Sequence, residues 1–394
     1  MRYLLLLGLL AALPAPAAGL HQALEKAWLR HPQGQTLGAA GAEIQARRAA
    51  AGSLTPIPPS LSVSQRGDQF NANRGQREWE AEIGLPLWLP GERQARRQLA
   101  DTSAEENTAA LAARRLALAG ELRETLWNWR LAASEVQLAH ERLDSAEALE
   151  NGIRRRVAAG DLAPLDLNLA RHETLAARAA LLERETRAAE TLRLWRALTG
   201  DGEPPLEEEE VFPSPSQLDA HPGLIAAQSG IALAQARLAL ARETPRENPE
   251  LALFTRSERG SADAAYVDSI GVRLRLPLAS EARNRPIMAA ANRELIRAES
   301  EAAQIRVRLE LDIERARQNL AAAREQFDLA SGQHELAREN LGWMRKAFDL
   351  GETSLFNLLK SRAAHLEGEL TLAQRRIGVA LSKARLNQAQ GVLP

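Results

Sequence analysis

The sequence repeats its own landmarks at a constant spacing, and this internal repeat constrains the fold more than any single residue does. The second copy of each landmark follows the first by about 190 residues along the whole chain. Each copy is therefore expected to contain the same elements in the same order. The landmarks are His31-Pro32 and His221-Pro222, Leu85-Pro86-Leu87 and Leu276-Pro277-Leu278, and Gly160 and Gly351.

Composition favours long, closely packed helices over conventional globular cores. Alanine and leucine dominate, with arginine and glutamate between them, and only 4% of residues are aromatic. The 50 basic and 51 acidic residues nearly cancel, so no overall field points to nucleic acid or to an acidic partner. The chain contains no cysteine, which excludes disulfides, thiolate catalysis, cysteine-ligated metals and lipid attachment to an N-terminal cysteine.

Residues 1–18 have the pattern of a secretory signal peptide. Arg2 supplies the positive start, Leu4–Leu13 form a short apolar core, and Ala15-Pro16-Ala17 is a small-residue cleavage site. The apolar run is too short to span a bilayer, which favours a signal over a membrane anchor. No later segment is expected to be long and apolar enough for a transmembrane helix.

Each copy contains a hairpin, at 55–88 and at 249–278, in which apolar and polar residues alternate. A period of two is typical of strands with one apolar and one polar face. The length of these strands suits a membrane β-barrel with an aqueous lumen, although a soluble hairpin with one buried face would show the same alternation. Trp88 is expected at a membrane interface. The side chains predicted to face the lumen are Glu78, Glu80, Glu82, Arg273 and Arg275.

Long helices follow both hairpins, at 91–157 and 282–350, and each is on the order of 100 Å long. Each ends at a glycine, a favoured left-handed helix stop. One helix, from His21 to about Gly52, is expected before the first hairpin. The predicted boundaries are 19–199 for the first copy, 200–216 for a linker and 217–394 for the second copy, with tip turns at 158–163 and 351–354 and following helices at 164–198 and 355–391.

Four strands cannot close a barrel, and an open sheet edge in lipid would leave backbone groups without partners. Other copies of the chain must therefore complete the barrel in a symmetric ring. The same ring would gather the helices into a hollow tube, which predicts a mixed membrane protein with an internal two-fold repeat.

Three patterns occur in order: Leu20-x-x-Ala23-Leu24-x-x-Ala27 followed by His31-Pro32, Leu85-Pro86-Leu87 followed by Gly91-x-Arg93, and Gly351-x-x-Ser354-x-x-Asn357-Leu358-Leu359. Together they resemble the TolC-like outer-membrane factors of Gram-negative efflux and type I secretion systems, over essentially all of the chain after residue 18. The resemblance implies a homotrimer: a trimeric α/β-barrel with a long α-helical coiled-coil barrel and four transmembrane β-strands per chain, twelve in all. It also implies an outer-membrane location, with the helical tube in the periplasm.

The resemblance further implies two partners, a periplasmic adaptor and an inner-membrane pump. The short chain and polar loops look most like the metal-resistance branch of the family. Three features depart from the family pattern. Pro277-Leu278-Ala279-Ser280 lacks the glycine of the first strand-to-helix passage, Ala163-Pro164 stands where a small hydroxyl residue is expected, and the lipidation cysteine of many relatives is absent.

The two tip turns are candidates for docking the adaptor, as the resemblance implies. Opposite charges near the tips are candidates for latches that keep the resting tube shut. Ordinary turn chemistry and solvated helix ends explain the same residues. The docking candidates are Gly160, Asp161, Pro164, Asp166, Gly351, Glu352, Ser354 and Asn357, and the latch candidates are Arg154, Arg155, Arg156, Asp349, Arg345 and Lys346.

No catalytic, cofactor-binding or metal-binding pattern is visible, and the seven histidines are scattered. The predicted function is a passive conduit, the outer-membrane component of a tripartite efflux system, and not an enzyme. The alternative is a soluble periplasmic coiled-coil adaptor or scaffold, which would explain the helices but not two hairpins at equivalent positions. The sequence does not distinguish metal ions from organic compounds as cargo.

Overall fold

The computed structural model describes residues 19–200, 202–205 and 218–394. The predicted signal peptide and most of the predicted linker at 200–216 lie outside the described residues. The first copy contains α1 (Leu20–Arg30), α2 (Pro32–Gly52), β1 (Ser60–Gly67), β2 (Arg77–Pro86), α3 (Glu92–Ala158) and α4 (Pro164–Thr199). The second contains a 3₁₀ turn (Leu218–Ala220), α5 (Pro222–Glu243), β3 (Glu250–Arg259), β4 (Val267–Arg275), α6 (Glu281–Asp349) and α7 (Leu355–Ala389).

The single helix expected from His21 to Gly52 is wrong, because the chain leaves the helical conformation at His31. His31 has φ −74° and ψ 121°, an extended conformation. A proline disfavours the helical region for the residue before it, which is why α1 ends and α2 begins at this step. The second copy has the same break, since the 3₁₀ turn ends just before His221 and α5 begins at Pro222.

The chain divides into two compact units, and the long helices α3 and α6 contribute residues to both. The sheet-bearing unit comprises Gln35–Ala113 and Pro222–Arg308. The helical unit comprises the described residues within Met1–Gly34, Arg114–His221 and Leu309–Pro394.

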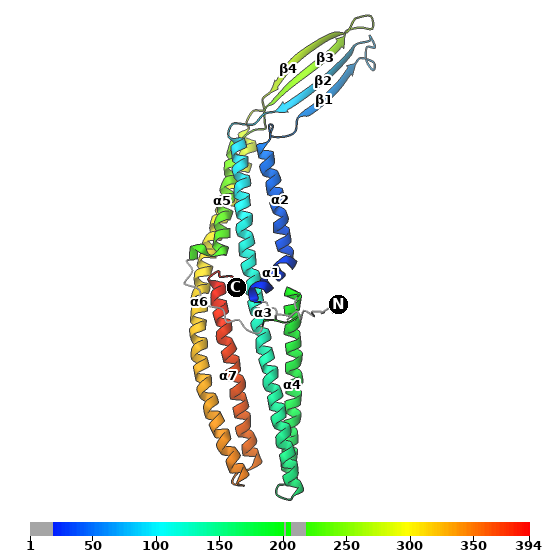
Figure 1. Cartoon of the computed structure of the whole chain (residues 1–394). Coiled ribbons are helices and arrows are strands. Elements are labelled where there is room, and N and C mark those ends of the chain that lie inside the picture. The colour runs from blue at the N-terminus through cyan, green and yellow to red at the C-terminus, as the bar shows by residue number, and fades with distance from the viewer. Residues whose placement is uncertain (1–18, 201, 206–217) are drawn as a thin grey trace, which may run out of the picture. The chain divides into compact units, whose positions relative to one another are not determined.

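The sheet has four antiparallel strands in the order β1-β2-β3-β4, which is also their order along the chain (Figure 1). The register pairs Leu61 with Ile83, Ile83 with Leu253, and Leu253 with Val272. Within the described residues, β1 and β4 each pair with one neighbour only, so each keeps one free edge.

The main core of the helical unit surrounds α1. Leu20, Ala23, Leu24 and Ala27 are buried against α3 and against Trp195 of α4. Small and large side chains alternate at this contact, which lets the helices approach closely while leucines fill the space between them. The α3 residues of the cluster are Leu118, Ala119, Leu122 and Leu126.

Helix α5 corrects the expectation that no later segment has transmembrane character. Its 22 residues are long and apolar enough to cross a membrane by length and composition, since an 18-residue stretch within them has a mean hydropathy of 1.3, and 22% of that stretch is buried. Alanine, leucine and isoleucine give α5 this hydropathy, and the same residues suit close helix packing. Length and composition alone are weak evidence for a membrane span.

The core around α1 gives a matched pair of substitutions within one helix. Leu24 is fully buried and Leu29 is 74% exposed. Leu24→Ala is expected to destabilise the helical unit by about 2–5 kcal/mol because it leaves a cavity, whereas Leu29→Ala leaves none. Thermal unfolding followed by far-UV circular dichroism should show a lower Tm for Leu24→Ala only. Equal effects of both changes would contradict the assigned core.

Candidate functional sites: the charged sheet face and the helical tip

The strand register places most of the polar residues of the four strands on one face of the sheet. The glutamate row of β2 (Glu78, Glu80 and Glu82) lies between serines and Arg66 of β1 and arginines of β3 and β4. The five residues predicted to face a lumen share this face, and their lumen role stays a prediction. The opposite face carries Leu61, Val63, Ile83, Leu85, Leu251, Leu253, Ile270, Val272 and Leu274, all of which are exposed.

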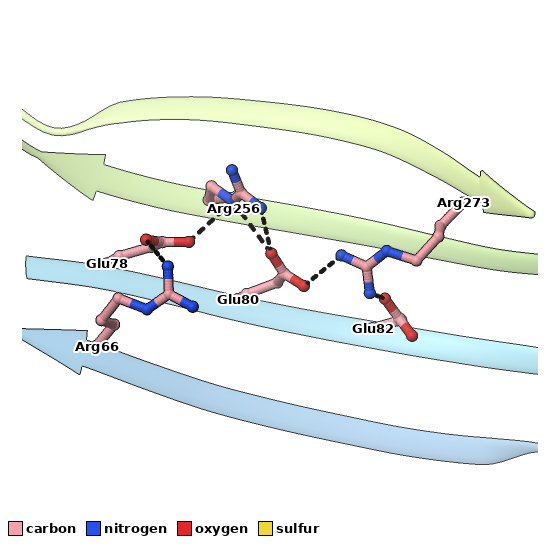
Figure 2. A network of polar contacts seen from close by, with 6 residues as sticks. All are labelled: Arg66, Glu78, Glu80, Glu82, Arg256 and Arg273. Atoms are coloured by element: carbon pink, nitrogen blue, oxygen red, sulfur yellow. Dashed lines mark hydrogen bonds and ion pairs between the residues drawn. The ribbon is translucent and has the colours of Figure 1, made fainter. Parts of the chain in front are cut away.

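Arginines neutralise the glutamate row from both sides, as Figure 2 shows. Arg256 of β3 lies 3.1 Å from Glu78 and 2.7 Å from Glu80. Arg273 of β4 lies 2.9 Å from Glu80 and also pairs with Glu82. Because neighbouring carboxylates share the same guanidinium groups, the charges form one network instead of isolated surface pairs.

Small residues make room for side chains that cross the strands. Arg273 reaches over β3 to β2, and the residue opposite it on β3 is Ala252, which is buried. A Cβ at Gly271 would lie 2.5 Å from the ring of Phe254, so this glycine gives the ring its place on the sheet. Arg273 and Arg256 hold their guanidinium groups 5.0 and 5.7 Å from that ring's centroid, within cation–π range.

Two members of the network were not among the predicted lumen residues. Arg66 lies 3.6 Å from Glu78, and Arg256 bridges Glu78 and Glu80. Arg66 belongs to the polar alternation of β1, so strand pairing alone would have placed it beside the glutamates. Arg256 lies after the clear apolar and polar alternation of β3, which covers residues 250–253. Its partners follow only from the register between β2 and β3, which belong to different repeats.

Both tip turns use the same backbone motif. Gly160 and Gly351 have φ of +84° and +79°, the left-handed conformation that glycine adopts without strain. At each turn the glycine N–H donates to the carbonyl three residues back, and the next N–H donates to the carbonyl five residues back. This pair of bonds is the Schellman motif, which satisfies carbonyl groups at a helix end.

The helices that follow the tips begin differently. The Ser354 hydroxyl accepts a hydrogen bond from the Asn357 backbone N–H at 3.4 Å, as expected of an N-cap. At the other tip, Ala163 has no side-chain acceptor. There the Asp166 carboxylate accepts from the Ala163 backbone N–H at 3.2 Å, and Pro164 occupies the first helical turn.

A groove of about 380 Å³ lies between the end of α3 and the end of α6. It brings together Arg155, Arg156 and Asp161 from the first tip with Asp349 from the second. The Arg156 guanidinium lies 5.0 Å from the Phe348 ring centroid, within cation–π range. The groove therefore offers both signs of charge beside an apolar surface.

None of the predicted latch residues forms an ion pair between the two tips in the part of the chain that the structure describes. Arg154 pairs with Glu150 of its own helix at 2.5 Å, and Glu150 also lies 3.6 Å from Arg171 of α4. No ion pair within the described residues involves Arg345 or Lys346. A latch at the tip thus stays a prediction.

Buried polar contacts that the sequence did not predict join α3 to α4 and to α7. Glu135 is 3% exposed and accepts hydrogen bonds from Arg184 and Gln374, each at 2.8 Å. Arg362 is also buried and donates to the Ser145 hydroxyl. Burial lowers the pKa of the Arg362 guanidinium. Helical periodicity gave no signal for these contacts, because both positions read as ordinary polar residues on long helices.

Comparisons with known proteins agree with this geometry. Residues 32–201 match the model of the family described as Outer membrane efflux protein. The cobalt-zinc-cadmium resistance protein CzcC of Cupriavidus metallidurans is 26% identical over 325 residues, which cover 78% of this chain and 74% of CzcC. The predicted resemblance to TolC-like outer-membrane efflux proteins is confirmed.

Solved structures confirm the fold over nearly the whole chain. A structure of CusC, from work on its folding and transmembrane channel formation, has a TM-score of 0.78 and 15% identity, covering 95% of this chain and 92% of CusC. The CmeC outer-membrane channel of Campylobacter jejuni has a TM-score of 0.74 and 14% identity, covering 94% and 85%. The open MtrE channel of Neisseria gonorrhoeae has a TM-score of 0.73 and 15% identity, covering 95% and 89%.

The charged network predicts how one arginine controls ion selectivity. Arg273→Gln removes a positive charge that faces both Glu80 and Glu82, so a lumen lined by this face should become more cation-selective. Reversal potentials across planar bilayers in a KCl gradient measure this shift. Arg259→Gln is the matched control, because Arg259 lies on the opposite face of the sheet. An equal shift from both variants would argue against the assigned faces.

Proposed function

We propose that this chain is the outer-membrane channel component of a tripartite efflux system. In this proposal three copies form a passive conduit that carries small molecules or metal ions from an inner-membrane pump and a periplasmic adaptor to the outside. The observation that carries it is the sheet, which has one charged face, one exposed apolar face and two free edges. A soluble adaptor would leave that apolar face in water, and no comparison supports it.

The edges of the sheet support closure by further copies. A free edge exposes backbone N–H and C=O groups, and each unsatisfied group in hydrocarbon costs several kcal/mol. If β4 of one copy pairs with β1 of the next, a ring of three chains gives a twelve-stranded barrel without edges. The apolar face would then meet lipid, and the charged face would line the lumen.

The helical unit offers matching edges. Most of its exposed large apolar residues lie on α4 and on or directly after α6, and none lies on α3. Three residues of α6 and Leu350, which directly follows α6, recur every seven residues, which is the spacing of a coiled-coil seam. The seam residues are Leu329, Leu336, Trp343 and Leu350, and the exposed α4 residues are Leu165, Leu175, Leu182 and Leu194. We assign these two surfaces to the contact between neighbouring copies.

The tip groove supports docking of an adaptor. A periplasmic adaptor presenting a helical hairpin would meet charges of both signs and the Phe348 ring within one groove. Arg345 and Lys346, which form no ion pair within the described residues, can then pair with the adaptor or with another copy.

The similarity to CzcC, a cobalt-zinc-cadmium resistance protein, suggests divalent metal ions as cargo of the proposed system. A growth assay of a deletion strain across cobalt, zinc, cadmium, dyes and antibiotics tests this assignment. Sensitivity confined to metals would support it, and sensitivity confined to organic compounds would contradict it.

Fractionation of the host cell tests the proposed function itself. The protein should partition with the outer membrane and run as a trimer on gels unless it is heated. A soluble periplasmic monomer would contradict the proposal and favour the adaptor.

The α6 seam predicts a loss of assembly from one substitution. Leu336→Asp places a charge in the centre of the apolar seam and should abolish the heat-sensitive trimer band. Ser331→Asp adds the same charge at an exposed position on a different side of α6, about 140° away from Leu336 around the helix axis, and is expected to leave the trimer intact. Normal trimers of Leu336→Asp would show that α6 does not contact another copy.

The tip groove predicts a loss of transport without a loss of assembly. A Cβ placed at Gly152 meets no atom within 4 Å, so a larger side chain can enter the groove without disturbing the fold. In a growth assay, Gly152→Leu should abolish the resistance that the wild-type protein gives the cell to its cargo, while leaving the amount of trimer unchanged. Gly378→Leu, also in open space, is the control. Full resistance of Gly152→Leu would rule out docking in this groove.

A further inference from the structure

The apolar face of the sheet is short for a membrane-spanning wall. Three rows of paired residues are apolar except for Thr255, and the next row toward the β1–β2 loop contains Gln65, Trp79, Ser257 and Asp268. Three rows extend over about 13 Å of strand, or about 10 Å after a tilt near 40°. The apolar band of an outer-membrane barrel is about 25 Å tall. The paired strands alone therefore cover less than half of it.

Exposed apolar side chains continue beyond the strands on the side toward the helices. Leu276 and Leu278 extend the alternation of β4, and they are 54% and 86% exposed. Before β1, Ile57 and Leu54 are 56% and 90% exposed. Four further residues add about 13 Å of chain, which brings the tilted apolar height to about 20 Å. This extension removes most of the shortfall.

Hydrogen bonds hold the chain before β1, where Leu54 lies. The Trp88 indole N–H donates to the Leu54 carbonyl at 3.1 Å. Arg93 donates to the Gly52 carbonyl at 2.6 Å, so the end of α2 is held as well. The Arg96 guanidinium lies 5.6 Å from the Trp88 ring centroid. A tryptophan with an apolar body and an adjacent cation suits the level of lipid headgroups.

We propose that Leu54, Ile57, Trp88, Leu276 and Leu278 form a collar that inserts into the inner leaflet of the outer membrane and binds its phospholipids. The proposal rests on the proposed function, because it takes the sheet to span that membrane. The collar supplies the apolar height that the paired strands lack. The leucines and the isoleucine contact acyl chains, and Trp88 with Arg96 lies at the phosphate level. The collar is continuous with the apolar sheet face, which favours lipid over a protein partner.

Because the chain contains no cysteine, single-cysteine labelling can test the collar directly. Leu54→Cys and Leu278→Cys would carry a nitroxide spin label in the full chain, reconstituted in vesicles of phosphatidylethanolamine and phosphatidylglycerol. Power-saturation measurements compare collisions with oxygen, which partitions into lipid, and with a water-soluble nickel chelate. Leu61→Cys on the apolar face and Ser62→Cys on the charged face are the controls.

The collar predicts that labels at Leu54 and Leu278 collide mainly with oxygen, as the label at Leu61 does, while the label at Ser62 collides mainly with nickel. Nickel access at Leu54 and Leu278 with oxygen access at Leu61 would overturn the collar and leave the membrane-spanning sheet intact. Nickel access at Leu61 too would overturn the proposed function. Shielding of the collar labels from both agents would show that protein covers this surface and would also overturn the collar.

Discussion

The rest of the structure depends on how the unpaired backbone N–H and C=O groups at the two free edges of the sheet find hydrogen-bond partners. In water, an edge strand can bond to solvent, and its cost is small. In hydrocarbon no such partner exists, so in the proposed channel β1 and β4 would need strands from other chains. In the proposed ring of three chains, the four-stranded sheet would be one third of the barrel wall.

The two faces of the sheet have different roles in the proposed barrel. The apolar face is too short to match the apolar layer of a membrane, and the proposed collar residues extend it toward the helices. The charged face is neutralised internally, since each glutamate of the row has at least one arginine partner. A neutralised wall holds cargo weakly, which suits a passive conduit better than a selective site. The same network ties β2 to β3 and β4, and thus joins the hairpins of the two repeats.

Sequence reasoning reached the order of elements, the long helices, the glycine turns and the alternating strands, because each depends on local periodicity or on one special residue. It missed the break at His31, although the proline after it carries a known local signal. It also missed the pairing of Arg66 and Arg256 with the glutamate row and the buried contacts of Glu135 and Arg362. Those contacts depend on the register between distant segments, and the register follows from packing and not from any one stretch of sequence.

The most direct test of the central claim joins the two edges covalently. In the cysteine-free chain, one cysteine placed in β1 and one in β4 will form disulfides between copies where the two edges are paired, since cross-strand Cβ atoms lie within reach. A scan of such pairs in outer membranes is expected to yield, for at least one register, a covalent ladder that ends at three chains. Monomers at every register, under conditions that oxidise a control disulfide, would contradict the closed ring.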